Sequence, residues 1–545
     1  MTPVLQRNLS ALSAGDPGIA QLLARTPASG AVRFLSARSG KTVPELLRDG
    51  HPRPSHSTVD PEREAGRLAA LQPASGYTVA LGLGGGYHLG PLLAEPSLGR
   101  LLVVERDLGL ARAVLERLDL STALADLRLR LLPGLEPPEV AQTVLGEYLP
   151  VLHGGLRTWP LRAAVEQDPQ YFREVTVGLR EAAVQAADDY AVQARLGRRW
   201  FVNTIANLET AERSTARPPA VQRAVVTGAG PSLEAQAPLL AGLRDGACLI
   251  ATDASLPALL GLGLTPDLVV SIDCQLYSYH HFLQGFPTGV PLALDLASPP
   301  VLGRLAPRAF YFAGGHPFSR YVSAHWLSLP ELDTSGGNVA QTAVSLAVSL
   351  GAREIHLAGL DFSYPKAKAY SRGTFLYSIA AGVQSRLLPV ESWFQAFLLE
   401  RRGKEQPRNT SRPLDLYRRR LEAYARTVPA RLAALPGAAF ELDLPEQPPA
   451  LRQATRLPVP ARPARPWRSF LEAYAAGLRQ LPEPCSPAFS YYRGLSGEDL
   501  QLCTTLLPAA AALRESLPAE RREGHQVLAM AREWSLERIR RRLES

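Results

Sequence analysis

The stretch VVTGAGPSLE at residues 225–234 decides the fold of this chain. It is an apolar, β-branched run followed by a glycine turn, a proline and a segment of helical composition. Glycines allow a tight turn and close backbone approach, and proline is favoured in the first turn of a helix. A strand, a glycine turn and a helix in this order are typical of one unit of a parallel α/β sheet.

Apolar runs of the same character recur on both sides of this stretch. They lie at 223–227, 248–252, 268–272, 291–295, 309–313 and 354–358. Helical segments separate them, and nearly every run ends at a glycine or an aspartate. This alternation predicts an α/β domain with a doubly wound, mostly parallel sheet over residues 218–400. Ligands of such sheets bind outside the carboxyl ends of the strands, so function is expected there.

A second α/β unit is predicted within residues 1–177. TVALGLGGGYHLGPLL, which starts at Thr78, and the later LLVVERD are typical of the opening of a Rossmann-like unit. The turn contains Gly82, Gly84, Gly85 and Gly86, and Glu105 closes the next strand. This turn is either purely structural or binds a nucleotide or a methyl donor.

The remaining segments are predicted to be helical. Residues 178–217 keep a helical period that only Gly197 interrupts, which indicates a connecting helix. Residues 401–545 are predicted to form a helical C-terminal domain, with an Arg-rich helix at 414–435. The prolines from 445 to 466 predict an extended linker within it.

Composition excludes several classes of protein. The chain has no basic and apolar leader, and no stretch reaches the roughly 18 apolar residues of a membrane helix. We therefore expect a cytoplasmic location and no membrane insertion. The four cysteines lack CxxC spacing, which argues against a zinc site. The formal charge of +8 comes partly from C-terminal Arg clusters, which are typical of solvated helix faces or of contacts with an anionic partner. No aromatic residues of the nucleic-acid-binding kind accompany them, so no nucleic-acid partner is expected.

Three groups of polar residues follow the predicted strands. The turn Gly228–Ser232 precedes a helix, and its backbone amides are candidates for phosphate binding. Asp253, Asp273 and Asp295 each close a strand, where they could bind ribose, a base or a cation, or cap a helix. The turn Thr334–Gly337 precedes another helix and predicts a second anion site. After the next strand come Asp361, Tyr364 and Tyr370, whose phenols could reach a leaving phosphate.

These motifs resemble a known family. GAGPSLE, PDLVVSID at 266–273 and GGNVAQTAVSLAVSLGAREIHLAGLDF look like the central domain of the motility-associated-factor (Maf) flagellin glycosyltransferases. The pattern is also similar to archaeal-type 6-hydroxymethylpterin diphosphokinases (MptE-like) and, more distantly, to bacterial sialyltransferases that use CMP-sialic acid. The resemblance covers about 180 residues of the central domain, and the glycine-rich unit before it also looks like the Maf N-terminal domain.

The resemblance implies a donor site for a nucleotide sugar. The residues expected to hold the nucleotide are Gly228, Gly230, Pro231, Ser232, Asp253, Asp273, Asp295, Thr334, Ser335, Gly336 and Gly337. Tyr370 and Asp361 are expected to be catalytic. The chain departs from the sialyltransferase pattern at Ala229, where that branch has Asn, and at Ser363, where it has a tyrosine. The downstream catalytic histidine of that branch is also missing, which leaves His280, His281, His316 or a carboxylate as candidate bases.

The resemblance therefore predicts a glycosyltransferase that moves a CMP-activated nonulosonic (sialic-acid-like) sugar to Ser or Thr of flagellin, for flagellar assembly and motility. No cofactor is implied beyond the donor, and no metal is strictly required, although the carboxylates leave Mg²⁺ binding open. Two alternatives remain. One is pyrophosphoryl transfer from ATP to a pterin alcohol, with Mg²⁺ held by Asp253 or Asp273; the other is a non-catalytic binding protein.

Overall fold

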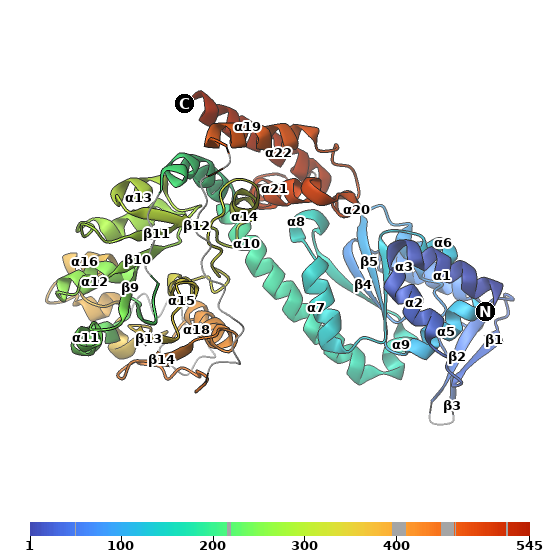
Figure 1. Cartoon of the computed structure of the whole chain (residues 1–545). Helices are drawn as coiled ribbons and strands as arrows, with labels where there is room; N and C mark the ends of the chain where they lie inside the picture. The colour runs from blue at the N-terminus through green and yellow to red at the C-terminus, as the bar shows by residue number, and fades with distance from the viewer. Residues whose placement is uncertain (49–50, 215–219, 395–409, 448–462, 464, 519–520) are drawn as a thin grey trace. The chain divides into compact units, whose positions relative to one another are not determined.

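The computed structural model describes residues 1–545 except 49–50, 215–219, 395–409, 448–462, 464 and 519–520 (Figure 1). The chain forms two compact units. Unit 1 comprises Met1–Gly197 and Leu481–Trp534, and unit 2 comprises Arg198–Gln480 and Ser535–Ser545. Among the helices of these described ranges, none combines the length and the apolar character needed to cross a membrane.

Unit 1 contains a parallel sheet and a small antiparallel one. The parallel sheet has the order β6-β5-β4-β7, and the antiparallel sheet has the order β1-β2-β3. The strands are β1 (Val32–Ser36), β2 (Thr42–Arg48), β3 (His51–Pro54), β4 (Gly76–Leu81), β5 (Leu98–Glu105), β6 (Leu129–Pro133) and β7 (Leu156–Pro160). The helices are α1 (Pro3–Gly15), α2 (Pro17–Arg25), α3 (Pro61–Leu71), α4 (Leu89–Leu93), α5 (Leu108–Arg117), α6 (Ser121–Leu124), α7 (Pro137–Glu147), α8 (Pro150–His153), α9 (Arg162–Gln167), α20 (Ala488–Gly494) and α21 (Gly497–Glu515).

Unit 2 is built on a parallel sheet of seven strands, in the order β12-β11-β10-β9-β8-β13-β14. The strands are β8 (Arg223–Thr227), β9 (Cys248–Thr252), β10 (Leu268–Ser271), β11 (Leu292–Asp295), β12 (Ala309–Phe312), β13 (Glu354–Ala358) and β14 (Arg431–Ala434). The helices are α11 (Ser232–Leu243), α12 (Leu256–Gly261), α13 (Pro300–Leu305), α14 (Pro317–His325), α15 (Val339–Ser349), α16 (Phe375–Gly382), α18 (Arg412–Ala425) and α19 (Trp467–Gln480). The short 3₁₀ helices are η1 (Asp253–Ser255), η2 (Leu276–Phe282) and η3 (Pro365–Ala367).

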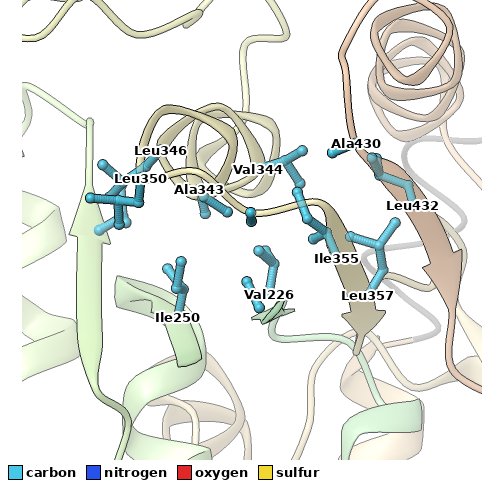
Figure 2. Packing of buried hydrophobic residues seen from close by; sticks show 14 of the residues in the cluster. Val226, Ile250, Ala343, Val344, Leu346, Leu350, Ile355, Leu357, Ala430 and Leu432 are labelled. Atoms are coloured by element: carbon cyan, nitrogen blue, oxygen red, sulfur yellow. The ribbon is translucent and has the colours of Figure 1, made fainter. Parts of the chain in front are cut away.

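Helix α15 covers the middle of this sheet. Its small and aliphatic residues, such as Ala343 and Leu346, are fully buried against Val226 of β8, Ile250 of β9 and Ile355 of β13 (Figure 2). Burying one such aliphatic side chain stabilises the fold by roughly 1.5–3 kcal/mol. The small residues let the helix lie close to the strands, and this packing fixes where its N-terminus meets the strand ends.

The six predicted strands of the central domain are all present, but the domain does not end at residue 400. α18 packs on the core of the sheet, and β14 pairs with β13 in parallel. The predicted helix at 414–435 is therefore wrong in its second half. Pro429 follows α18 and cannot continue a helix because its nitrogen carries no hydrogen. Most of the predicted proline-rich linker, namely 448–462 and 464, lies outside the described residues.

The long helix α10 (Pro169–Arg213) belongs to both units, because the division falls after Gly197. In its second half, Asn203 donates to the carbonyl groups of Cys274 and Ala297. One turn later, Asn207 donates to the carbonyl groups of Leu296 and Ser298. Both amide side chains are buried, so α10 fixes the loops that follow β10 and β11. The second half of the helix, from Arg198, is thus part of unit 2, whereas the sequence predicted a separate connector.

The C-terminal segment also differs from the predicted independent helical domain. α19 packs in unit 2, α20 and α21 pack in unit 1, and α22 (Gly524–Glu544) has residues in both. α20 contacts α8 and β5, α21 contacts α8, and Phe470 of α19 lies beside Tyr321 of α14. Arginines of this region form ion pairs, such as Arg540 with Glu544 at 2.9 Å.

Candidate functional site

A pocket of about 250 Å³ lies at the carboxyl ends of β8, β9 and β13. The chain order of the sheet reverses between β8 and β13, and this reversal is where doubly wound sheets bind ligands. The lining residues are Gly228, Ala229, Gly230, Thr252, Asp253, Ala254, Asn338, Val339, Ala340, Gly359, Leu360, Asp361, Phe362, Ser363, Tyr364, Ala369, Tyr370, Leu414 and Tyr417.

The turn after β8 contacts the turn after β13 directly. The N–H of Gly228 donates to the carbonyl oxygen of Ala358, and that of Gly230 donates to the carbonyl oxygen of Gly359, both at 2.8 Å. A Cβ atom at Gly230 would clash with this second carbonyl and with the carboxylate of Asp361. Glycine is therefore required at residue 230 because two backbones approach closely there.

Asp361 joins three segments around the pocket. Its Oδ2 accepts from the N–H of Ser232 at 2.9 Å, and its Oδ1 accepts from the N–H of Ala439 at 2.9 Å. The side chain is 2% exposed. Asp361 thus ties the start of α11 to the segment after β14, and it acts as a positioning residue as well as a lining residue.

The same bonds correct the predicted phosphate site at Gly228–Ser232. Three amides of this turn, those of Gly228, Gly230 and Ser232, donate to acceptors within the protein. Pro231 and Ser232 are not among the residues that line the pocket. The turn shapes the pocket wall, and the start of α11 is neutralised by Asp361.

The start of α15 supplies the second side of the pocket. Asn338 is the N-cap, and its Oδ1 accepts from the N–H of Gln341 at 3.0 Å. Val339 and Ala340 are the first two helical residues and line the pocket. The first amides of a helix have no partner inside the helix, and the helix dipole favours an anion there. The α15 N-terminus is therefore the part of the pocket wall whose amides suit an anion.

The predicted turn Thr334–Gly337 lies before this helix start and does not line the pocket. Thr334 Oγ1 accepts from the N–H of Gly315 at 2.9 Å, and the Ser335 carbonyl accepts from Arg420 at 2.9 Å. A Cβ atom at Gly336 would clash with Gln341, and Gly337 has a φ of +70°. The turn closes the loop before α15, while the anion site begins at Asn338. The preference of asparagine for N-caps is the sequence signal that marks this start.

Of the three predicted aspartates, only Asp253 lines the pocket. It is 3% exposed, its Oδ2 accepts from Ser271 Oγ at 2.6 Å, and its Oδ1 accepts from the N–H of Ala254 at 2.7 Å. Burial raises the pKa of this carboxyl above its usual range, and an electrostatic interaction with His281 partly offsets the rise. A carboxylate with a raised pKa is a better proton acceptor, so Asp253 can act as a base.

Asp273 and Asp295 lie further along the same edge. Asp273 Oδ1 accepts from the N–H of Gln275 at 2.8 Å. Asp295 is fully buried, accepts from the N–H of Ala297 at 2.7 Å and lies 3.8 Å from His316 Nε2. Burial raises the pKa of Asp295 and lowers that of His316. Their strands, β10 and β11, are two and three places from β8, and neither residue lines the pocket.

The loop after β13 carries unusual backbone geometry. Phe362, Lys366 and Ala367 have φ values of 45°, 52° and 58°, in the left-handed region that residues with side chains seldom occupy. Tyr364 and Tyr370 line the pocket from this loop. Such strained residues cluster at ligand-binding sites, where the surrounding structure holds them in place.

None of the predicted histidine bases lines the pocket. His280 stacks on Phe375 with ring centroids 4.7 Å apart, and His316 stacks on Trp200 at 4.1 Å. His281 interacts electrostatically with Asp253 of the pocket wall. Among the residues that the structure describes, no group of three or more His, Cys, Asp or Glu side chains could hold a metal ion.

Comparisons with known proteins identify a domain within unit 2. Residues 201–367 match the model of the family described as 6-hydroxymethylpterin diphosphokinase MptE-like. An uncharacterized protein of Treponema pallidum (strain Nichols) is 30% identical over 171 residues, which are 30% of this chain and 79% of that protein. The chain belongs to the family of proteins that carry an MptE-like domain. The pocket lies in this domain, except for Ala369, Tyr370, Leu414 and Tyr417.

A second uncharacterized protein of the same organism is 35% identical over 148 residues, which are 24% of this chain. The chain spans 51% of the length of that relative. The structure of a Maf glycosyltransferase from Magnetospirillum magneticum AMB-1 superposes with a TM-score of 0.59 at 14% identity. The match covers 99% of this chain and 95% of that chain, so this MptE-like protein has the Maf fold throughout.

Proposed function

We propose that this protein is a cytoplasmic glycosyltransferase that transfers a CMP-activated nonulosonic sugar to Ser or Thr hydroxyls of flagellin. The observation that carries the proposal is the fold match over 99% of the chain with a protein titled a Maf glycosyltransferase. The MptE-like match alone accounts for residues 201–367. Large flanking regions suit a protein acceptor better than a small-molecule acceptor.

The pocket supplies a chemical route for this reaction. The donor phosphate binds at the N-terminus of α15, on the amides of Val339 and Ala340, and Tyr370 donates a hydrogen bond to it. The bond between the anomeric carbon and the phosphate oxygen breaks, and CMP leaves with the electron pair. The acceptor hydroxyl oxygen forms the new bond to the anomeric carbon and gives its proton to Asp253. Asp361 holds the start of α11 and the segment after β14 in place.

Replacement of Val339 tests the anion site. Val339→Pro removes one amide hydrogen, while proline is tolerated at the first position of a helix. The preceding Asn338 has φ −139° and ψ 152°, which are compatible with a following proline. Val339→Ala shortens the same side chain but keeps the amide. A charged hydrogen bond contributes about 1.5–3 kcal/mol, so we expect CMP to bind the proline variant about 10- to 150-fold more weakly than the alanine variant.

One specific observation favours a second function. The matching family model is described as a pterin diphosphokinase, which would use ATP and Mg²⁺ with Asp253 or Asp273 as ligands. Thermal unfolding with CMP and with ATP plus Mg²⁺ separates the two functions. Stabilisation by CMP alone supports the transferase, whereas stabilisation only by ATP with Mg²⁺ contradicts it.

The acceptor and the catalytic role need a cellular test. The gene is deleted, and the mass of flagellin is measured in cells complemented with wild type, Val339→Ala, Val339→Pro or Tyr370→Phe. We expect wild type and Val339→Ala to restore the added glycan mass, and the other two to restore little of it. If Val339→Pro and Tyr370→Phe, each tested alone, both restored the added glycan mass in full, this result would support a non-catalytic binding protein instead.

A further inference from the structure

Unit 1 contains a pocket of about 350 Å³ at the carboxyl ends of β4, β5 and β7. The order β6-β5-β4-β7 places the reversal of chain order between β4 and β7, which is where α/β sheets bind ligands. The lining residues are Ala31, Leu46, Ser55, Gly84, Glu105, Arg106, Asp107, Leu110, Ala164, Gln167, Asp168 and Phe172. All of them lie outside the MptE-like domain.

Within the part of the chain that the structure describes, two polar side chains of this pocket have a buried atom without a hydrogen-bond partner. Ser55 is 2% exposed, and its Oγ has no hydrogen-bond partner among the residues that the structure describes. Within the same described residues, Nε2 of Gln167 at the end of α9 is also buried without a partner. Buried polar atoms are normally hydrogen-bonded, and exceptions occur where a ligand supplies the missing bond. The pocket therefore has an unused donor and an unused hydroxyl at its wall.

Glu105 ends β5 and is 5% exposed. Its Oε2 accepts from the N–H of Leu83 at 3.0 Å, and its Oε1 accepts from the N–H of Asp107 at 3.1 Å. A carboxylate has about four acceptor positions, so Glu105 can accept further bonds from hydroxyl groups. An acidic residue near the end of the second strand of a Rossmann unit accepts ribose hydroxyls in this way.

The glycine turn of this pocket does not suit a phosphate. Its Gly85 N–H donates to Nε2 of His56 at 2.9 Å, and its Gly86 N–H donates to the carbonyl of Leu83 at 2.9 Å. Tyr87 stands where the dinucleotide fingerprint has its third glycine. The helix that follows, α4, has only 5 residues. The turn therefore keeps its amides for internal bonds.

The charges of the lining residues also argue against a phosphate ligand. Glu105, Asp107 and Asp168 are acidic, and Arg106 is the basic residue among the described residues that line the pocket. Arg106 forms an ion pair with Asp168, so it is not free for a phosphate. The pocket repels anions and suits a neutral or cationic ligand. Leu110 and Phe172 add apolar surface on which a planar base can pack.

We propose that this pocket binds a ribonucleoside without phosphate groups, with the ribose hydroxyls on Glu105 and with Ser55 and Gln167 as further hydrogen-bond partners. This is a second ligand site, and it is independent of the function proposed for the MptE-like domain.

Calorimetric titration of the full chain with adenosine, cytidine, guanosine and uridine tests the proposal. We expect at least one of them to bind and its 2′,3′-dideoxy counterpart to bind at least tenfold more weakly. For adenosine, we also expect S-adenosylmethionine, which carries net positive charge, to bind more tightly than AMP. Absence of binding by all four ribonucleosides, equal binding of the dideoxy form, or tighter binding of AMP would each overturn the proposal.

Two variants test whether the nucleoside binds in this pocket. Ser55→Ala removes a hydroxyl that has no partner among the described residues, so the fold should persist, and circular dichroism checks this. We expect Ser55→Ala to weaken nucleoside binding by about 2- to 12-fold, which corresponds to the loss of one hydrogen bond. CMP binding should be unchanged. Gln167→Ala should act similarly, and Ser10→Ala on the exposed face of α1 is the matched control. If neither Ser55→Ala nor Gln167→Ala weakened nucleoside binding, the proposal that the nucleoside binds in this pocket would be overturned.

Discussion

Replacement of Asp361 should loosen two segments that are far apart in the sequence. Asp361 is 2% exposed and accepts from the N–H groups of Ser232 and Ala439, both at 2.9 Å. A hydrogen bond to a charged group contributes about 1.5–3 kcal/mol, so Asp361→Ala should cost about 3–6 kcal/mol. Asp361→Asn keeps one acceptor oxygen and should cost about half as much, because its amide nitrogen can donate but cannot accept.

Hydrogen exchange with peptide resolution measures this loss locally, which matters because the chain has two compact units and unfolding need not be two-state. In Asp361→Ala we expect exchange about 10²- to 10⁴-fold faster around residue 232 and around residue 439, with β4 in unit 1 unchanged. Asp443→Asn, at a carboxylate that is 78% exposed, is the control. Acceleration at only one of the two segments, or equal effects of Asn and Ala, would refute the reasoning.

Two further predictions concern unit 1. A Cβ atom at Gly197 of α10 would overlap the carbonyl of Pro508 in α21, so Gly197→Ala should lower stability by about 1–3 kcal/mol. Gly66→Ala, in an open position of α3, should instead raise stability by about 0.5–1 kcal/mol, and thermal unfolding of both variants compares the signs. Burial raises the pKa of Glu105 to about 7 from 4.5. The stability associated with its protonated form is present below pH 4.5 and is lost as pH rises through 7, by roughly 3 kcal/mol. The free energy of unfolding in urea should therefore rise for Glu105→Gln relative to wild type as the pH increases from 5 to 8. The same pH dependence of this free energy in both proteins would contradict the prediction.

The strands of the central domain were predictable because each is a short apolar run between turns. β14 was not, since two of its four residues, Ala433 and Ala434, have low strand preference and the strand follows an Arg-rich helix. Its pairing with β13 makes it a strand, which is a tertiary effect. Pro429 was the available local signal that the helix had ended.

The candidate site was predictable in its location but not in its details. The strand ends and glycine turns indicated the edge of the sheet at which the pocket lies. The sequence could not place Asp295 relative to Asp253, because that depends on strand order. β11, which carries Asp295, lies two strands from β9, which Asp253 follows, and at about 4.8 Å per strand this is about 10 Å. Nor could the sequence reveal that Asp361 occupies the start of α11, because the partner is 129 residues away.

The central claim is that the α15 N-terminus binds the phosphate of the donor nucleotide. A crystal structure of the full chain with CMP tests it most directly. We predict phosphate oxygens within hydrogen-bonding distance of the Val339 and Ala340 amide nitrogens, beside Tyr370. A phosphate bound elsewhere, with the α15 start empty at saturating CMP, would contradict the account.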